Sequence, residues 1–322
     1  MGPGPDSLFE RAEHLEQEGN LQEACECWRL LAEEQRDDPA VSCRLAGVLV
    51  ELGLEDEASR AFSHALSIDP GCIAAAKGLS FILIEREENE LVERVLVNAT
   101  KYEKDATVYF LLGIVQDRLG KRDEAKHNFE SALKLRPDYE EAYFNLGLLF
   151  REESPAEAER LMRKALEIDS NYAPAHRELG WILVGRGGDL AAAEYHLQRS
   201  IELDPGNEWA HIYLGNLMWR KGDLPAARTA FMQALELAPA QAFPKSLFAE
   251  FLEGTKELDQ AQLLYEEALS IDPADADLMV RLAGVLRKRG NSGSARDYLV
   301  SALQVVPDHP AALRLLSELD RL

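Results

Sequence analysis

Small and large apolar residues recur along the chain at intervals of about 34 positions. A small residue stands at positions 12, 46, 80, 113, 147, 180, 215, 249 and 283. Later in most intervals an alanine is followed four positions on by a large apolar residue and three further on by a small one, as in Ala125, Phe129 and Ala132. Spacings of three and four place such residues on one helix face. The pattern therefore predicts two amphipathic helices in each interval.

Turn residues separate the predicted helices. Prolines at 70, 137, 205, 239, 273 and 307 follow the second helix of an interval, and glycines at 19, 53, 120, 187, 222 and 290 fall between its two helices. Glycine tolerates the left-handed backbone conformation that ends a helix. Ser7 and Glu10 have the spacing of a capping box, which predicts the start of the first helix. Each interval is thus expected to form two antiparallel helices of roughly 14 residues.

Together these residues resemble the tetratricopeptide repeat, most clearly in Tyr143-x-x-Leu146-Gly147-x-x-Phe150. The resemblance implies an all-α fold, a right-handed α-α superhelix of about nine helix-turn-helix repeats plus a C-terminal capping helix. The expected repeats are 5–38, 39–72, 73–105, 106–139, 140–172, 173–207, 208–241, 242–275 and 276–309. Residues 1–4 are expected to be a flexible leader and 310–322 the capping helix.

Charge and composition narrow the class of partner. The 322 residues include 57 acidic and 35 basic side chains, for a net charge of −22. Such acidity argues against binding to nucleic acid or to anionic lipid surfaces. No apolar stretch approaches the roughly 18 residues of a membrane-spanning helix, so no membrane partner is expected. The four cysteines are too few for a disulfide framework, and a reducing cytoplasm is the expected compartment.

No sequence motif predicts catalysis, a cofactor or a metal site. Six residues separate Gly113 from Gly120-Lys121, whereas a phosphate-binding loop needs four and a hydroxyl after the lysine. Cys25 and Cys27 lie two apart on a predicted helix and point to nearly opposite faces, so they cannot share one ion. The protein is therefore expected not to be an enzyme and to need no cofactor.

The family resemblance also implies where a partner would bind. In that family the first helix of each repeat lines a concave groove, and the matching positions here are rich in aromatic residues and arginine, the types enriched at binding hot spots. The candidate groove residues are Lys77, Phe81, Phe110, Arg118, Phe144, Arg151, Arg177, Trp181, Trp209, Asn216, Trp219, Arg220 and Phe243. A peptide segment of another protein, apolar with acidic residues, would suit them.

Three other interpretations of these positions stay open. Some of the side chains would be buried between neighbouring first helices, in which case they belong to the core. A second copy of the chain would cover the groove if the protein is a self-associating homo-oligomer. The chain could also present substrate to a catalytic partner as an accessory module of a multi-subunit enzyme. The favoured hypothesis is a non-catalytic adaptor or scaffold that binds a partner segment in the groove.

Overall fold

A computed structural model describes residues 7–320, which form helices and short connections with no strand among them. The helices are α1 (Leu8–Gln17), α2 (Leu21–Glu34), α3 (Pro39–Glu51), α4 (Glu55–Ile68), α5 (Ile73–Glu85), α6 (Asn89–Ala99), α7 (Ala106–Arg118), α8 (Arg122–Leu135), α9 (Glu140–Phe150), α10 (Pro155–Ile168), α11 (Ala173–Gly185), α12 (Leu190–Leu203), α13 (Glu208–Lys221), α14 (Leu224–Leu237), α15 (Ala242–Gly254), α16 (Leu258–Ile271), α17 (Ala276–Lys288), α18 (Ser292–Val305) and α19 (Pro310–Leu319).

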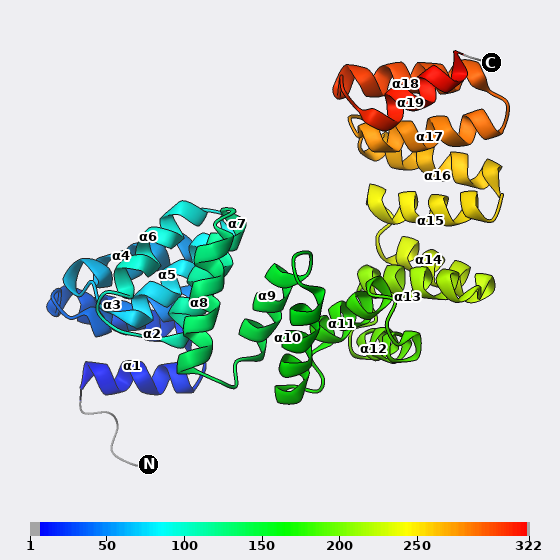
Figure 1. Ribbon diagram of the computed structural model, residues 1–322. Helices are drawn as coiled ribbons and strands as arrows, with labels where there is room; N and C mark the ends of the chain where they lie inside the picture. Colours follow the sequence, from blue (N-terminus) through cyan, green and yellow to red (C-terminus); the bar gives the residue numbers. More distant parts are fainter. Residues whose placement is uncertain (1–6, 321–322) are drawn as a thin grey trace. The chain divides into compact units, whose positions relative to one another are not determined.

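Successive helices pack as pairs, from α1 with α2 to α17 with α18, and α19 packs on α18 and α17 (Figure 1). The expected all-α superhelical fold class is confirmed. The expected leader 1–4 and the last two residues of the 310–322 segment lie outside the described residues. The chain divides after Asp169 into two compact units, which we call the N-terminal unit (residues up to 169) and the C-terminal unit (from 170).

Small residues let the two helices of a pair approach closely. A Cβ atom on Gly113 of α7 would lie 2.7 Å from Cε1 of Phe129 on α8, and one on Gly180 would lie 2.6 Å from Cγ of Leu197. Either contact would force a shift. Phe129 is 1% exposed and Leu197 is fully buried, so the large second-helix residues fill the space that the glycines leave. The apolar face that the sequence pattern predicts is therefore the core of each unit.

The tight turns inside the pairs use left-handed residues. All six glycines predicted for this role, at 19, 53, 120, 187, 222 and 290, have positive φ. Three pairs lack a glycine there, and two of them place Glu87 and Lys256 in the same conformation, with φ of 60° and 67°. A side chain in this region costs about 1–2 kcal/mol. The fold thus imposes the turn geometry even where the residue type opposes it.

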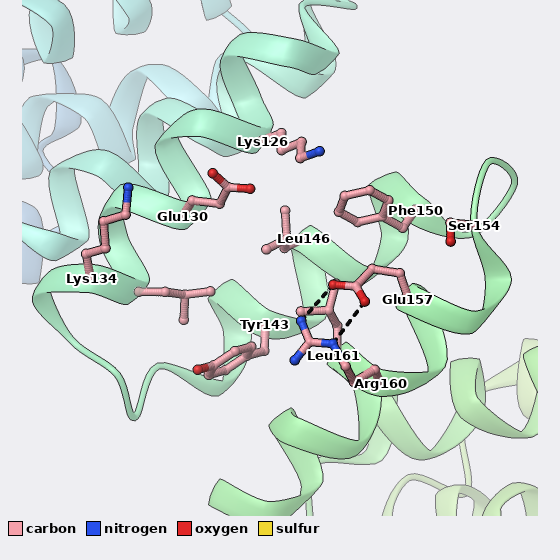
Figure 2. A pocket seen from close by; sticks show the side chains of 11 residues that line it. Lys126, Glu130, Lys134, Tyr143, Leu146, Phe150, Ser154, Glu157, Arg160 and Leu161 are labelled. Carbon is pink, nitrogen blue, oxygen red and sulfur yellow. Dashed lines mark hydrogen bonds and ion pairs between the residues drawn. The ribbon is translucent and has the colours of Figure 1, made fainter.

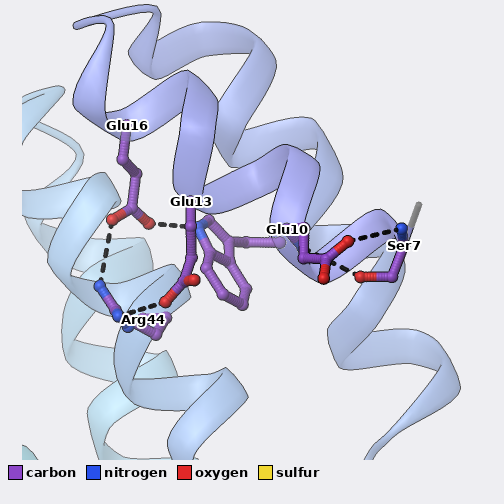
Figure 3. A network of polar contacts seen from close by, with 6 residues as sticks. Ser7, Glu10, Glu13, Glu16 and Arg44 are labelled. Carbon is purple, nitrogen blue, oxygen red and sulfur yellow. Dashed lines mark hydrogen bonds and ion pairs between the residues drawn. The ribbon is translucent and has the colours of Figure 1, made fainter. Parts of the chain in front are cut away.

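Polar contacts fix the start of α1 (Figure 3). Glu10 donates its backbone N–H to Ser7 Oγ at 3.2 Å, and Ser7 donates its own to the Glu10 carboxylate at 3.1 Å. The predicted capping box is therefore confirmed. The fully buried Trp28 of α2 donates its indole N–H to Glu16, which also pairs with Arg44 of α3 at 3.3 Å. These contacts join α1, α2 and α3.

Candidate protein-binding surface

Four aromatic rings from three first helices of the C-terminal unit form a continuous series, which we call the aromatic ladder. Trp181 of α11 stacks on Tyr213 of α13, with ring centroids 4.6 Å apart and planes 19° apart. Tyr213 lies 6.0 Å from Trp209 on the same helix, and Trp209 lies 5.0 Å from Phe243 at the start of α15. Each ring is thus held by at least one other, in separations that favour aromatic pairs.

Helix geometry explains how the ladder arises. Trp209 and Tyr213 are four positions apart on α13, so they lie on one face of that helix. The first helices also contact one another in series, α11 with α13 and α13 with α15. Phe243 is 47% exposed, Trp181 and Trp209 are half-buried, and Tyr213 is 8% exposed. The ladder therefore combines one buried ring with three that keep surface available to a partner.

Two arginines near the ladder are engaged by neighbouring groups. Arg177 donates from Nε to the carboxylate of Glu178 at 3.1 Å and from Nη1 to Oδ1 of Asn207 at 3.4 Å. Arg220 donates from Nη1 to the backbone carbonyl of Val184 at 2.7 Å, which ties α13 to the end of α11. Arg220 is exposed, whereas the Arg177 side chain is 19% exposed. Arg220 is thus the better placed of the two to meet an acidic group.

Two other candidates on α13 lie apart from the ladder contacts. Trp219 packs edge-on against Phe251 of α15, with centroids 5.6 Å apart. A Cβ atom on Gly254 would lie 2.5 Å from the Trp219 ring, so the indole covers this glycine closely. Asn216 donates its side-chain amide to the Ile212 carbonyl at 3.2 Å. Both side chains are half-buried and have contacts inside the unit.

The candidates of the N-terminal unit have different surroundings. Phe110 packs on Tyr139 at 4.7 Å and on Phe129 at 6.0 Å, and Phe144 is 8% exposed. These rings therefore pack into the interior of the unit. Phe81 of α5, in contrast, is 52% exposed.

The charged candidates of this unit stand on the first helices. Lys77 of α5 forms an ion pair with Asp105 at 3.4 Å, and the same carboxylate accepts the backbone N–H of Val108 at the start of α7. Arg118 is exposed in the last turn of α7, and Arg151 is half-buried at the end of α9. Lys77 therefore stabilises a helix start, while Arg118 is open to solvent.

Tyr213 is the ladder residue that sequence reasoning missed. It is not one of the positions that the family resemblance assigns to a groove. The available signal is its spacing of four from Trp209, which places two aromatic rings on one helix face. Its partner Trp181 lies 32 positions earlier in the chain, so only the packing of α11 on α13 brings the two rings together.

A separate open cavity of about 650 Å³ lies in the N-terminal unit between α8, α9 and α10 (Figure 2). Lys126 of α8 places its ammonium 4.4 Å from the centre of the Phe150 ring. On another side Arg160 forms two hydrogen bonds with Glu157, at 2.9 and 2.6 Å, and these lower the pKa of the Glu157 carboxyl below its usual value. None of the candidate groove residues lines this cavity, whereas Tyr143, Leu146 and Phe150 of the repeat motif do.

Residues 7–320 contain neither a metal-binding cluster nor a membrane-spanning helix. No group of three or more histidine, cysteine, aspartate or glutamate side chains in this part of the chain could hold a metal ion. Within the same residues, every helix is too short or too polar to cross a bilayer.

Comparisons with known families identify the repeat. Two models described as tetratricopeptide repeat match the chain, one at residues 110–173 and 148–208 and the other at 186–247 and 253–319. These matches cover more than half of the chain and agree with the paired helices. The chain therefore belongs to the tetratricopeptide repeat family, whose fold serves in general as a scaffold for protein–protein interaction.

Two curated relatives share part of their length with this chain. The human protein O-mannosyl-transferase TMTC3 is 30% identical over 193 residues, which is 57% of this chain and 21% of the relative. The repeat-containing protein YpiA of Bacillus subtilis is 28% identical over 126 residues, 38% of this chain and 30% of the relative. The chain thus spans less than a third of either relative.

Solved structures show the same fold at low identity. A crystal structure of the Cut9–Hcn1 hetero-tetramer of the APC/C is similar with a TM-score of 0.65 and 16% identity, over 97% of this chain and 75% of that one. The type IV pilus biogenesis factor PilW is similar with a TM-score of 0.61 and 20% identity, over 66% of this chain and 98% of that one.

Proposed function

We propose that this protein is a non-catalytic adaptor that holds a segment of a partner protein on the aromatic ladder of its C-terminal unit. The observation that carries the proposal is the continuous contact of Trp181, Tyr213, Trp209 and Phe243 across α11, α13 and α15. Exposed aromatic rings already fixed by neighbours supply apolar contact area with little further loss of side-chain entropy on binding. Such a surface suits a partner segment with apolar residues.

The charge of Arg220 favours partner segments that carry an acidic residue. Arg220 is exposed on α13 while donating one hydrogen bond to Val184, and a guanidinium has five N–H donors. An acidic residue in the partner would find unused donors there, and a charge-assisted contact would set its register. We accordingly propose an apolar segment that carries at least one carboxylate.

The test uses peptides selected from a random peptide library on the immobilised 322-residue protein. Their affinity is then measured by calorimetry for the wild type, for the double variant Trp181→Ala and Trp209→Ala, and for Phe81→Ala as the matched exposed control. We expect the double variant to bind at least about tenfold more weakly, because hot-spot truncations typically cost more than 1 kcal/mol. The control should bind like the wild type. Equal binding by wild type and double variant contradicts the proposal.

Sedimentation across a concentration series distinguishes self-association through the ladder from binding of a partner segment. If a second copy of the chain covers the ladder, the wild type sediments as a dimer or larger species at high concentration and the double variant sediments as a monomer. A monomeric wild type at all concentrations excludes the homo-oligomer. We propose the cytoplasm as the compartment, supported by four free cysteines.

A second candidate function is an accessory module that presents substrate to a catalytic chain. The similarity to the human protein O-mannosyl-transferase TMTC3 favours it, although the match spans 21% of that protein. In this case the peptides selected on the ladder would be substrates of an associated enzyme. Adding the chain to such an enzyme would lower the KM for ladder-binding peptides and leave other peptides unaffected.

A further inference from the structure

Two thiols from different repeats meet in the N-terminal unit. Cys43 lies on α3, Cys72 immediately precedes α5, and their sulfur atoms are 3.4 Å apart. Both side chains are half-buried and neither is in a disulfide. A disulfide bond is about 2.0 Å long, so a movement of little more than 1 Å would bring the sulfurs to bonding distance.

The local structure leaves the Cys72 side chain free to make this contact. Cys72 is the N-cap residue of α5, yet its side chain accepts no hydrogen bond from the helix. Its backbone N–H is held by the carbonyl of Asp69 at 3.0 Å, across the turn formed by Pro70 and Gly71. The helices α3 and α5 contact each other as first helices of neighbouring pairs, and both lie beside α4 in Figure 1.

We propose that Cys43 and Cys72 form an oxidation site that a low-molecular-weight disulfide, such as oxidised glutathione, converts to an intramolecular disulfide joining α3 to α5. The inference concerns the N-terminal unit and does not depend on the function proposed for the aromatic ladder.

The oxidation proceeds by two exchange steps. One protein thiol loses its proton and attacks a sulfur of the low-molecular-weight disulfide, which forms a mixed disulfide and releases one thiolate. The second protein thiol then loses its proton, attacks the protein-side sulfur of the mixed disulfide and releases the second thiolate. The two departing thiolates take up the two protons. The protein loses two electrons and two protons, and the added disulfide is reduced to two thiols.

The surroundings of the two thiols determine which of them reacts first. Burial and the hydrogen bond with Cys72 raise the pKa of the Cys43 thiol to about 12, so Cys43 is a poor first nucleophile. Cys72 is accordingly the thiol that attacks the small disulfide, and Cys43 is the one that resolves the adduct. The reaction accelerates as the pH rises, because the attacking species is the thiolate.

The other two cysteines provide an internal control. Cys25 and Cys27 lie on α2 and are 4% and 6% exposed. Burial raises the pKa of the Cys25 thiol. In the folded protein these two thiols should therefore react much more slowly than Cys43 and Cys72.

The experiment incubates the reduced 322-residue protein with oxidised glutathione at pH 8, unfolds it in urea to block the remaining thiols with iodoacetamide, and digests it with trypsin without reduction. We expect the intact mass to fall by about 2 Da, the loss of two hydrogens. Peptides 37–44 and 61–77, which hold Cys43 and Cys72, should appear as one cross-linked species. Peptide 12–29, which holds Cys25 and Cys27, should appear with two blocked thiols.

The variants separate the proposal from its alternatives. Cys43→Ser should stop at a glutathione adduct on Cys72, and Cys72→Ser should react much more slowly. Oxidation should also raise the melting temperature of the wild type by several degrees, reversibly with a dithiol reductant, and leave that of both variants unchanged. Glutathione adducts on separate cysteines, disulfide-linked dimers, or a cross-link involving peptide 12–29 would overturn the proposal.

Discussion

The aromatic residues of the two units differ in what surrounds them, although they occupy corresponding first helices. In the N-terminal unit Phe110 packs on Tyr139 and Phe129, and Phe144 is 8% exposed. In the C-terminal unit Trp181, Trp209 and Phe243 contact rings on other first helices and keep exposed surface. Phe110 and Phe144 are the fifth residues of their repeats, whereas Trp181 is a ninth residue and Trp209 and Phe243 are second residues. The position of a ring within its repeat therefore separates the buried rings from those that keep exposed surface.

The largest expected effect tests this difference directly. Phe144→Ala should lower the free energy of unfolding by about 3 kcal/mol, because it leaves a cavity in the N-terminal unit. Trp181→Ala should cost only about 1 kcal/mol, since part of its ring is exposed already. Urea unfolding followed by hydrogen exchange reports each unit separately. A loss at Trp181 as large as that at Phe144 would show that the ladder is core.

The second test compares how tightly the helix pairs pack in the interiors of the two units. Ala132 of α8 is fully buried and Ala234 of α14 is 1% exposed, each at the same place in its repeat. Replacing either with Leu should overpack the pair and cost about 1–3 kcal/mol. Urea titrations should give similar losses for both. Tolerance of leucine in only one unit would mean that its helix pairs are packed more loosely.

Replacing each of two buried serines with alanine should change the free energy of unfolding in opposite directions. Ser80 of α5 is fully buried, and its hydroxyl has no hydrogen-bond partner among the described residues. Ser200 of α12 donates to the Ala173 carbonyl at 3.0 Å. Ser80→Ala should raise the unfolding free energy by about 1 kcal/mol, and Ser200→Ala should lower it by about as much. Calorimetric melting of both variants checks the signs, and a destabilised Ser80→Ala variant would reveal a partner for that hydroxyl.

The smallest expected effect concerns the left-handed turns. Glu87 lies in the N-terminal unit and Lys256 in the C-terminal unit, both with positive φ. Glu87→Gly and Lys256→Gly should each stabilise the protein by about 0.5 kcal/mol, because glycine removes the steric cost but adds entropy to the unfolded chain. Glu88→Gly serves as the control, since Glu88 has φ of −79° and should gain nothing. A gain at only one turn would show that the units differ there.

The repeat pattern predicts the helices well because every pair buries the same face in the same way. The glycine turns, the Ser7 capping box and the buried alanines and phenylalanines all follow from local geometry. The aromatic ladder could not be predicted in full, because Trp181 meets Tyr213 only through the register of α11 on α13. The division after Asp169 also has no sequence signal, since the 34-residue period continues through it.

The distribution of tryptophan gives the protein a built-in optical probe. Of its four tryptophans, Trp181, Trp209 and Trp219 lie in α11 and α13, and Trp28 lies in α2. Tryptophan emission from a Trp28→Phe variant, excited at a wavelength that tyrosine does not absorb, would consequently arise from the C-terminal unit alone. Two of the emitters belong to the ladder, so the same signal would follow both the melting of that unit and the arrival of a ligand on its rings.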